Sequence, residues 1–419
     1  MASNQITGQT LHSLLRLPIN KNFQPLQDAD VGALQNRLRH LKYLVIDEKS
    51  MLGLQTLGWI DSRLRQVFPD RQDEWFGGVS ILLVGDFFQL PPVQQKPLYS
   101  NGAIPRAGNG NTHHYEIIGQ NAYRQFDKTV FLKTIQRQQG SDQSGFRKAL
   151  EELRHLELSV SSWELLSSRV QSELSDNEIH SFRNALRIYS TKKRVKQYNY
   201  DHLVALNKPV VQVHAQHTGK NAENASSEKA GNLVSKFPVC IGARVMMTRN
   251  IWPAVGLVNG AQGTVKDLGW APGADVTRDP PCVLMVRFDQ YDGPAFEVEG
   301  VEVPYVPIFP VRQDFNIGNE ACSRKQFPLT VAYAITVHKS QSITVDQVVT
   351  DLSERDFQHG LSYVAVSRVK TLRGLMLELP FERNTLYYPA DKRPPGLKAK
   401  LEDQARRQGQ RLLRPLYGP

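Results

Sequence analysis

Short apolar runs alternate with amphipathic stretches over residues 41–132. The runs "YLVI", "VSILLV" and "TVFL" have the length and the β-branched composition of buried strands. Strands that alternate with helices are typical of a parallel sheet flanked by helices. The pattern therefore predicts an α/β unit in the first third of the chain.

One helix of this unit follows the first strand. Its apolar positions recur at helical spacing and form one stripe, made of Leu57, Ile60, Leu64, Val67 and Phe68. The charged positions outside the stripe are Asp61, Arg63 and Arg65. We expect the stripe to lie in the core and the three charged side chains to point away from it.

A second α/β pattern begins near residue 130. After a charged helical region over 146–187, "ALRIYS" and "VVQVH" resemble strands, and "KKRVKQYNYDHLVAL" resembles a helix. Residues 243–310 then change to short strands separated by Gly, Pro and Asp turns, which predicts a small all-β module. Because α/β character returns with "PLTVAYAITVHKSQS", the module is predicted to be inserted in the second unit.

Composition narrows the class of protein. The chain has 419 residues, 40% of them hydrophobic, which is enough for several globular units. Its net charge of +10 suits a polyanion such as nucleic acid, although an acidic protein or a membrane surface would also fit. Three scattered cysteines favour neither a disulfide framework nor a zinc site. No apolar run reaches the roughly 18–20 residues of a membrane span, so we expect a soluble, intracellular protein.

Acidic and amide side chains follow both of the first two predicted strands. Asp47 and Glu48 come after "YLVI", while Asp86 and Gln89 come after "VSILLV". The carboxyl ends of parallel strands meet ligands in a shared crevice. In nucleotide hydrolases the first acid of such a pair holds Mg²⁺ through water and the second orients or deprotonates the attacking water. Two strand ends of this kind favour a nucleotide site.

Two further segments carry groups suited to phosphate. The loop after "VAYAI" gathers the side chains of Thr336, His338, Lys339, Ser340 and Gln341. Arg368 follows "SYVAVS", and a guanidinium is the usual group that reaches a transferring phosphoryl across a cleft. Taken alone, His338 would be a structural histidine and Arg368 a surface arginine.

Together these motifs carry a resemblance to a known family. In order, the chain contains "GQTLHSLLRLP", "LVIDEKSM", "LLVGDFFQLPPV", "TIQRQQ", "VMMTRNIWPAVGLVNGAQGTV", "AYAITVHKSQSITVD" and "GLSYVAVSRV". They resemble the helicase motifs of the Pif (petite integration frequency) family of superfamily-one DNA helicases. The resemblance covers residues 7–379. It implies two RecA-like lobes that bind ATP between them, 5′ to 3′ movement along single-stranded DNA, and a small β-barrel inserted in the second lobe.

The resemblance also implies roles and boundaries. The catalytic residues would be Asp47, which also holds Mg²⁺ through water, Glu48, Gln89, Arg137 and Arg368. The cofactor-binding residues would be Asp86 and Gln341, and the DNA track would contain Thr10, His12, Thr336, His338 and Lys339. The implied divisions are a truncated first lobe (1–130), a second lobe (131–242 and 326–390), its inserted barrel (243–325) and a basic tail (391–419). For that tail we favour a solvated, frayed helix over a nucleic-acid arm.

The sequence departs from the family pattern in three places. It contains no G-x-x-x-x-G-K-[ST] run, the loop whose amides and lysine cradle phosphates. The chain is therefore expected to start just downstream of that loop. Lys49 replaces an apolar residue and puts a positive charge beside the acids, whereas Ser342 replaces a glycine and narrows the conformations open to its loop.

The expected function is that of an ATP- and Mg²⁺-dependent 5′ to 3′ DNA helicase, present as a fragment or an incomplete sequence. The expected partners are single-stranded DNA and DNA junctions, without a membrane. The expected context is telomere maintenance, recombination and repair, in the nucleus rather than the mitochondrion. The alternative is a degenerate or non-catalytic single-stranded-DNA-binding remnant, for example from a rolling-circle transposon helicase. An adaptor for an acidic partner would bind DNA without preferring single strands.

Overall fold

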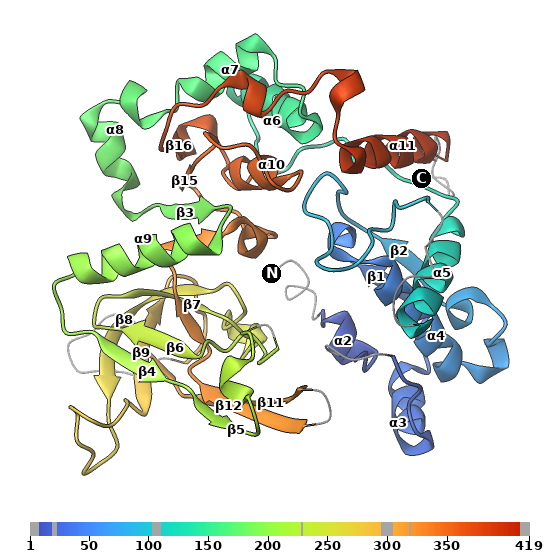
Figure 1. The fold of residues 1–419 in the computed structure, drawn as a ribbon, viewed down its shortest axis with the longest axis horizontal. Helices are drawn as coiled ribbons and strands as arrows, with labels where there is room; N and C mark the ends of the chain where they lie inside the picture. The colour runs from blue at the N-terminus through green and yellow to red at the C-terminus, as the bar shows by residue number, and fades with distance from the viewer. Residues whose placement is uncertain are drawn as a thin grey trace. The chain divides into compact units, whose positions relative to one another are not determined.

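The computed structural model describes residues 8–18, 23–102, 110–227, 229–294, 305–317 and 320–410 (Figure 1). The chain divides into two compact units. The N-terminal unit comprises Gln9–Glu173, Leu352–Arg373 and Leu379–Pro419, and the central unit comprises Met1–Gly8, Leu174–Asp351 and Gly374–Glu378. The predicted boundaries of the two lobes and of the inserted barrel do not coincide with this division of the chain. They stay predictions.

The N-terminal unit is mainly helical around one small parallel sheet. Strands β1 and β2 pair in register, Tyr43 opposite Ser80. Its described elements are α2 (Leu11–Leu14), α3 (Asp28–Leu38), β1 (Tyr43–Ile46), α4 (Leu54–Val67), β2 (Ser80–Leu83), α5 (Gly110–Arg124), α6 (Ser144–His155), α7 (Val160–Ser167), α10 (Leu361–Val366) and α11 (Pro395–Gly409).

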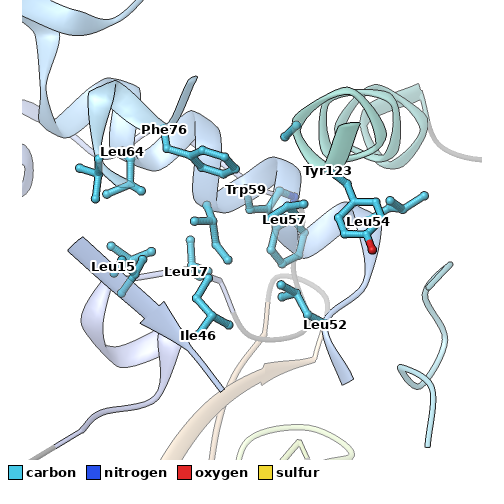
Figure 2. Packing of buried hydrophobic residues seen from close by; sticks show 14 of the residues in the cluster. Leu15, Leu17, Ile46, Leu52, Leu54, Leu57, Trp59, Leu64, Phe76 and Tyr123 are labelled. Atoms are coloured by element: carbon cyan, nitrogen blue, oxygen red, sulfur yellow. The ribbon is translucent and has the colours of Figure 1, made fainter. Parts of the chain in front are cut away.

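Helix α4 forms the centre of this unit's core, as Figure 2 shows. The predicted stripe is confirmed: Leu57, Ile60, Leu64 and Val67 are buried, and Phe68 packs against them half-buried. Helices α4 and α5 approach very closely, since a Cβ on Gly119 would stand 1.9 Å from the Leu54 carbonyl oxygen. Glycine permits this contact because it has no side chain.

The prediction for the charged residues of α4 was wrong for Asp61 and Arg63, which are buried. Asp61 accepts hydrogen bonds from the Phe76 backbone N–H (2.7 Å) and from Arg65 Nε (2.8 Å). Arg63 donates to the Gln24 carbonyl oxygen at 3.1 Å. Helix α4 is thus enclosed on more than its apolar side, and these polar groups are buried with hydrogen-bond partners.

The first two predicted strands are confirmed, but they are buried on one face only. Leu44 and Ile46 lie in the core, while Tyr43 and Val45 are 68% and 57% exposed. On the neighbouring strand end, Leu82 and Val84 are also exposed. Strands of parallel sheets are ordinarily covered on both faces. In the described part of the chain, this sheet therefore presents an open apolar face.

The third predicted strand, "TVFL", does not form. Thr129 makes only an isolated bridge, and Val130 and Leu132 are 67% and 87% exposed. The run is apolar, yet no neighbouring described strand offers it a hydrogen-bonding edge. Apolar composition alone therefore misassigned it.

The central unit combines a parallel sheet with antiparallel ones. The parallel sheet has the order β14-β3-β15-β16, and "ALRIYS" supplies its strand β3 as predicted. The other predicted strand, "VVQVH", forms but pairs antiparallel with residues 236–239, outside the parallel sheet. Its described elements are α8 (Asp176–Ser181), β3 (Leu186–Tyr189), α9 (Lys192–Ala205), β14 (Ala334–Thr336), β15 (Val348–Thr350) and β16 (Leu375–Leu377).

The described residues of 243–310 form strands, as predicted, and antiparallel strands also lie before and after that stretch. A five-stranded antiparallel sheet has the order β10-β9-β8-β7-β13, and β11-β12-β5 and β4-β6 form smaller sheets. The bounds are β4 (Val211–His214), β5 (Gln216–Thr218), β6 (Lys236–Val239), β7 (Arg244–Met247), β8 (Gln262–Gly269), β9 (Val283–Phe288), β10 (Val306–Ile308), β11 (Val311–Ile317), β12 (Glu320–Gln326) and β13 (Leu329–Val331). Whether these strands form a closed barrel stays a prediction.

The C-terminal helix differs from the expected solvated helix. In α11, Leu397, Lys400, Asp403 and Arg407 are all buried. Asp403 accepts from the Tyr123 hydroxyl at 3.1 Å, which ties α11 to α5. The prediction failed because a polar sequence was taken for an exposed one. Residues 411–419 of the tail lie outside the described residues. Within the described ranges, every helix is too short or too polar to span a membrane.

Truncation of the α4 core should weaken the N-terminal unit. We expect Leu57→Ala to lower its free energy of unfolding by about 2–5 kcal/mol, because the fully buried side chain leaves a cavity. Tyr43→Ala, on the open sheet face, should cost about 0.5 kcal/mol or less. Urea unfolding followed by circular dichroism measures both, and equal losses would contradict this account of the core.

Candidate functional site

The paired acids lie at the carboxyl end of β1 with a strained backbone. Glu48 has φ 54° and ψ 46°, the left-handed conformation, and Asp47 Oδ1 accepts from the Glu48 N–H at 2.8 Å. A non-glycine residue rarely adopts this conformation, and such residues cluster at functional sites. This backbone conformation determines the direction in which the Glu48 side chain points from the end of the strand.

The end of β2 is held against the acids. The Lys49 N–H donates to the Val84 carbonyl oxygen at 2.9 Å. Gly85, with φ 128°, permits this approach, since a Cβ there would lie 3.0 Å from the Lys49 nitrogen. The Lys49 ammonium packs over the Phe87 ring, 4.6 Å from its centroid, and burial lowers its pKa although Asp86 acts in the opposite direction.

Two arginines predicted for the site are near Glu48 in the N-terminal unit. Arg137 donates to the Ser367 carbonyl oxygen at 2.9 Å, and Arg368, 3% exposed, donates to the Val364 carbonyl oxygen at 2.8 Å. Burial and then the charge of Arg137 lower the pKa of Arg368 to about 10, while Glu48 acts in the opposite direction. Arginine side chains are not deprotonated in proteins at neutral pH. Like charges held together beside one acid create a site that favours an added oxyanion.

Asp86 is held by residues that sequence reasoning missed. Arg154 of α6 binds it with two hydrogen bonds, at 2.9 and 3.0 Å, and the Tyr363 hydroxyl of α10 donates at 3.3 Å. Burial would raise the pKa of Asp86, but the hydrogen bonds and charge of Arg154 outweigh it and hold the pKa below its usual value. Asp86 thus links the end of β2 to two later helices.

The Gln89 segment has a second anchor in Lys400 of α11. The Lys400 ammonium, 1% exposed, lies 3.1 Å from the Gln89 carbonyl oxygen and 2.8 Å from His359 Nδ1. Burial lowers the pKa of Lys400 to about 7. Next to His359, Gly360 has φ 101°, and a Cβ there would stand 2.6 Å from the Phe88 carbonyl oxygen. The Gln89 side-chain oxygen is buried without a hydrogen-bond partner, which suits a group that meets a ligand.

The predicted DNA-track residues fall in both units. In the N-terminal unit, Thr10 caps α2 by accepting from the Ser13 N–H at 3.3 Å, and burial lowers the pKa of His12. In the central unit, Thr336, His338 and Lys339 lie at and beyond the carboxyl end of β14. Thr10 therefore has a structural role whether or not it meets DNA.

The same loop of the central unit holds Gln341 and Ser342. The amide nitrogen and oxygen of Gln341 are both buried without hydrogen-bond partners. Ser342 has φ 64°, so the position where the family pattern has glycine takes a left-handed backbone here too. The expected constraint on this loop is confirmed, because the serine carries a conformation that glycine adopts without strain.

The acids at the end of β1 suit the way in which proteins hold Mg²⁺. This ion keeps several waters and is usually held by one or two carboxylates together with substrate phosphates. Asp47 is exposed at the strand end and its Oδ1 is oriented by the Glu48 N–H. A single oriented, accessible carboxylate of this kind fits that mode of binding. In the described part of the chain, His, Cys, Asp and Glu side chains form no group able to hold a metal by themselves.

Comparison with known proteins gives consistent matches. The PIF1-like helicase family matches residues 1–144, and the DNA helicase Pif1 2B domain matches residues 236–268. An ATP-dependent DNA helicase Pif1 from Bdellovibrio bacteriovorus is 31% identical over 377 residues, which cover 88% of this chain and 74% of that protein. The ATP-dependent DNA helicase Pif1 from Psychrobacter sp. is 26% identical over 415 residues, which cover 90% of this chain and 60% of that protein.

A solved structure matches over nearly the whole chain. The Pif1 helicase from Bacteroides in complex with ADP-AlF3 and ssDNA aligns with a TM-score of 0.66 and 25% identity, covering 98% of this chain and 86% of that one. The likeness confirms the predicted class, a mixed α/β fold of the RecA-like helicase type.

The Asp86–Arg154 pair should control stability in a pH-dependent way. Because the pKa of Asp86 is lowered, its ionised form contributes stability that is fully present above the unfolded pKa, near 4, and is lost as pH falls from there through the lower folded pKa. In Arg154→Met, burial should dominate and raise the pKa of Asp86. We expect a loss of about 3–5 kcal/mol at pH 7 that narrows toward pH 4, measured by urea unfolding.

Asp86→Asn combined with Arg154→Met is the control for this pair, since it removes the uncompensated charge and should recover part of the loss. A loss below about 1 kcal/mol in Arg154→Met at pH 7 would contradict the assignment.

The left-handed serine gives a prediction for the central unit. A left-handed backbone costs an L-residue about 1–2 kcal/mol, and glycine costs about 0.5–1 kcal/mol in chain entropy. Ser342→Gly should therefore raise stability by up to about 1 kcal/mol, measured as slower native-state hydrogen exchange. Thr344→Gly, at an exposed position without positive φ, should lower it. Stabilisation by both changes would contradict the strain argument.

Proposed function

Because the chain belongs to the Pif1-like family of DNA helicases, we propose that it works as an ATP-dependent helicase that moves 5′ to 3′ on single-stranded DNA. One observation carries the proposal. Glu48, in a strained conformation at the end of β1, lies within electrostatic range of the Arg137 and Arg368 guanidiniums, whose charged forms it favours. An acid with two neighbouring arginines suits phosphoryl transfer to water.

Each residue then has a role in hydrolysis. Glu48 would orient the attacking water and accept its proton, and Arg137 and Arg368 would stabilise the negative charge of the transferring phosphoryl group. Asp47 would hold Mg²⁺ through water, and the ion would neutralise phosphate charge. Asp86 and Gln89 would couple the state of the γ-phosphate to the DNA, because Arg154 and Lys400 fix the backbone that carries them.

The DNA track would use the loop that follows β14. Thr336, His338 and Lys339 offer donors to backbone phosphates, and Gln341 would meet the nucleotide with its buried, unpartnered amide. Thr10 and His12 would extend the track. The net charge of +10 supports binding to DNA, and the matched Bacteroides helicase is described with ssDNA.

The same proposal covers architecture and context. The predicted lobes, with a β-barrel inserted in the second, are supported by the parallel sheet of the central unit and the antiparallel sheet beside it in sequence. A first lobe that lacks part of its sheet is supported by the exposed Tyr43, Val45 and Leu82. Action on DNA junctions in telomere maintenance, recombination and repair, in the nucleus, follows only from the family.

One observation favours a second candidate, a single-stranded-DNA-binding protein without ATP turnover. The sequence has no G-x-x-x-x-G-K-[ST] run, so most of the usual phosphate-binding donors are missing from it. Both candidates bind DNA with an affinity that falls as salt rises. Only the helicase candidate hydrolyses ATP.

ATP turnover by the 419-residue chain separates these two candidates. The helicase proposal expects Mg²⁺-dependent turnover that single-stranded DNA stimulates and that Glu48→Gln lowers by about 100-fold or more. The amide keeps the shape of the carboxylate but cannot accept the proton, so DNA affinity should stay unchanged. Single-stranded DNA binding without turnover would support the second candidate, and equal turnover in both proteins would contradict the role of Glu48.

A further inference from the structure

The central unit contains a cavity of about 770 Å³ that the proposed helicase chemistry does not use. It lies where Arg183–Arg187 lead into β3 and where Ala332 and Tyr333 precede β14. Its volume is in the range of small-molecule and cofactor sites. A cavity of this size at a defined place in the fold raises the question of what it holds.

Its position separates it from the DNA track. Strands β3 and β14 are parallel, with Ala334 opposite Arg187 and Thr336 opposite Tyr189. The cavity is therefore at the amino ends of these strands, whereas Thr336 and His338 are at and beyond the carboxyl end of β14. A ligand in the cavity would occupy a second, separate place.

The lining is positively charged. It includes the arginines Arg183, Arg187 and Arg244, and none of its residues is Asp, Glu or Lys. Arg187 Nε lies 3.5 Å from a Glu378 carboxylate oxygen, and Arg244 pairs with Asp289 at 2.6 Å. These pairs hold the two guanidiniums in place from outside the lining, and Arg244 also donates to Thr264 and Gln262, so that its terminal N–H groups are occupied. Arg183, which is exposed, is the arginine left to meet a ligand. Guanidinium groups in fixed orientations match the geometry of phosphate oxygens.

One wall is a stack of planar groups. The Arg187 guanidinium lies 4.6 Å from the Tyr198 ring centroid, the Tyr198 and His202 rings are stacked at 4.1 Å, and the His202 and Tyr333 rings are 5.0 Å apart. The Tyr333 hydroxyl accepts from the Arg244 backbone N–H at 3.2 Å. The wall is therefore rigid before any ligand binds, which lowers the ordering cost of binding.

The remaining lining supplies space and hydrogen-bonding groups. Ala185, Ala205, Gly242 and Ala332 are small and leave room, while Asn184, Gln262 and Thr264 carry polar side chains. Amide and hydroxyl groups of this kind can form hydrogen bonds with the edges of a nucleobase. Phosphate-matching arginines, a planar wall and polar edges together correspond to the parts of one nucleotide.

We propose that this cavity binds a nucleoside phosphate, either as a free nucleotide or as one nucleotide unit of a DNA strand. The guanidinium of Arg183 binds the phosphate, and the base lies against the Tyr198–His202–Tyr333 wall. The proposal does not depend on ATP turnover, because it concerns binding at another place in the chain.

The test blocks the cavity with one substitution. Ala205, exposed at the end of α9, lines the cavity, whereas its exposed neighbour Val204 does not. Ala205→Trp should fill the opening without disturbing the core, and Val204→Trp is the matched control. Equal thermal unfolding of the two variants verifies that the fold is kept. Arg183→Ala removes one phosphate donor, and Arg278→Ala, at a side chain that is 86% exposed, controls for charge.

Two probes distinguish binding of a free nucleotide from binding of a nucleotide unit in a DNA strand. Adenosine monophosphate is titrated by calorimetry, and a fluorescent oligothymidylate by anisotropy. A free-nucleotide site is supported if Ala205→Trp and Arg183→Ala each weaken the affinity for adenosine monophosphate by about tenfold or more. Their control variants should keep the wild-type affinity. The same pattern for the oligonucleotide alone supports a strand-binding site. Unchanged affinity for both probes in both cavity variants overturns the proposal, whatever the ATPase result.

Discussion

The ion pair between Asp86 and Arg154 is the interaction on which the candidate site depends. It joins the end of β2 to α6, and the Tyr363 hydroxyl adds α10 to the same carboxylate. Because α10 leads directly to Arg368, this pair fixes the acid-bearing strand ends and an arginine in one unit. A half-buried charge cluster costs desolvation energy. Its main effect is therefore to fix the positions of these groups relative to one another.

Backbone conformation supplies the second constraint. Glycine occurs where β2 approaches the acids and where α10 meets the Gln89 segment, and at both places a side chain would be too close to backbone atoms. Glu48 and Ser342 take left-handed conformations without being glycine. Of the nine described non-glycine residues with positive φ, these two lie beside groups proposed to meet phosphate, where backbone strain is typical of functional sites.

Sequence reasoning found the parts of the site that are local in the chain. Acids after a strand and a stripe at helical spacing follow from nearest-neighbour geometry, so Asp47, Glu48 and the α4 core were predictable. Arg154 and Lys400 were not, because their partners are 68 and 311 residues away and no spacing rule connects them. The burial of Asp61 and the exposure of Leu132 likewise depend on which distant segments cover them.

The open face of the β1–β2 sheet has a consequence for the behaviour of the chain in solution. Tyr43, Val45, Leu82 and Val84 are apolar, adjacent and accessible to water. Apolar patches beside unpaired strand edges favour contact between molecules. The net charge of +10 opposes that contact at low ionic strength, and salt screens the repulsion. We therefore expect salt that weakens DNA binding also to favour self-association through this face.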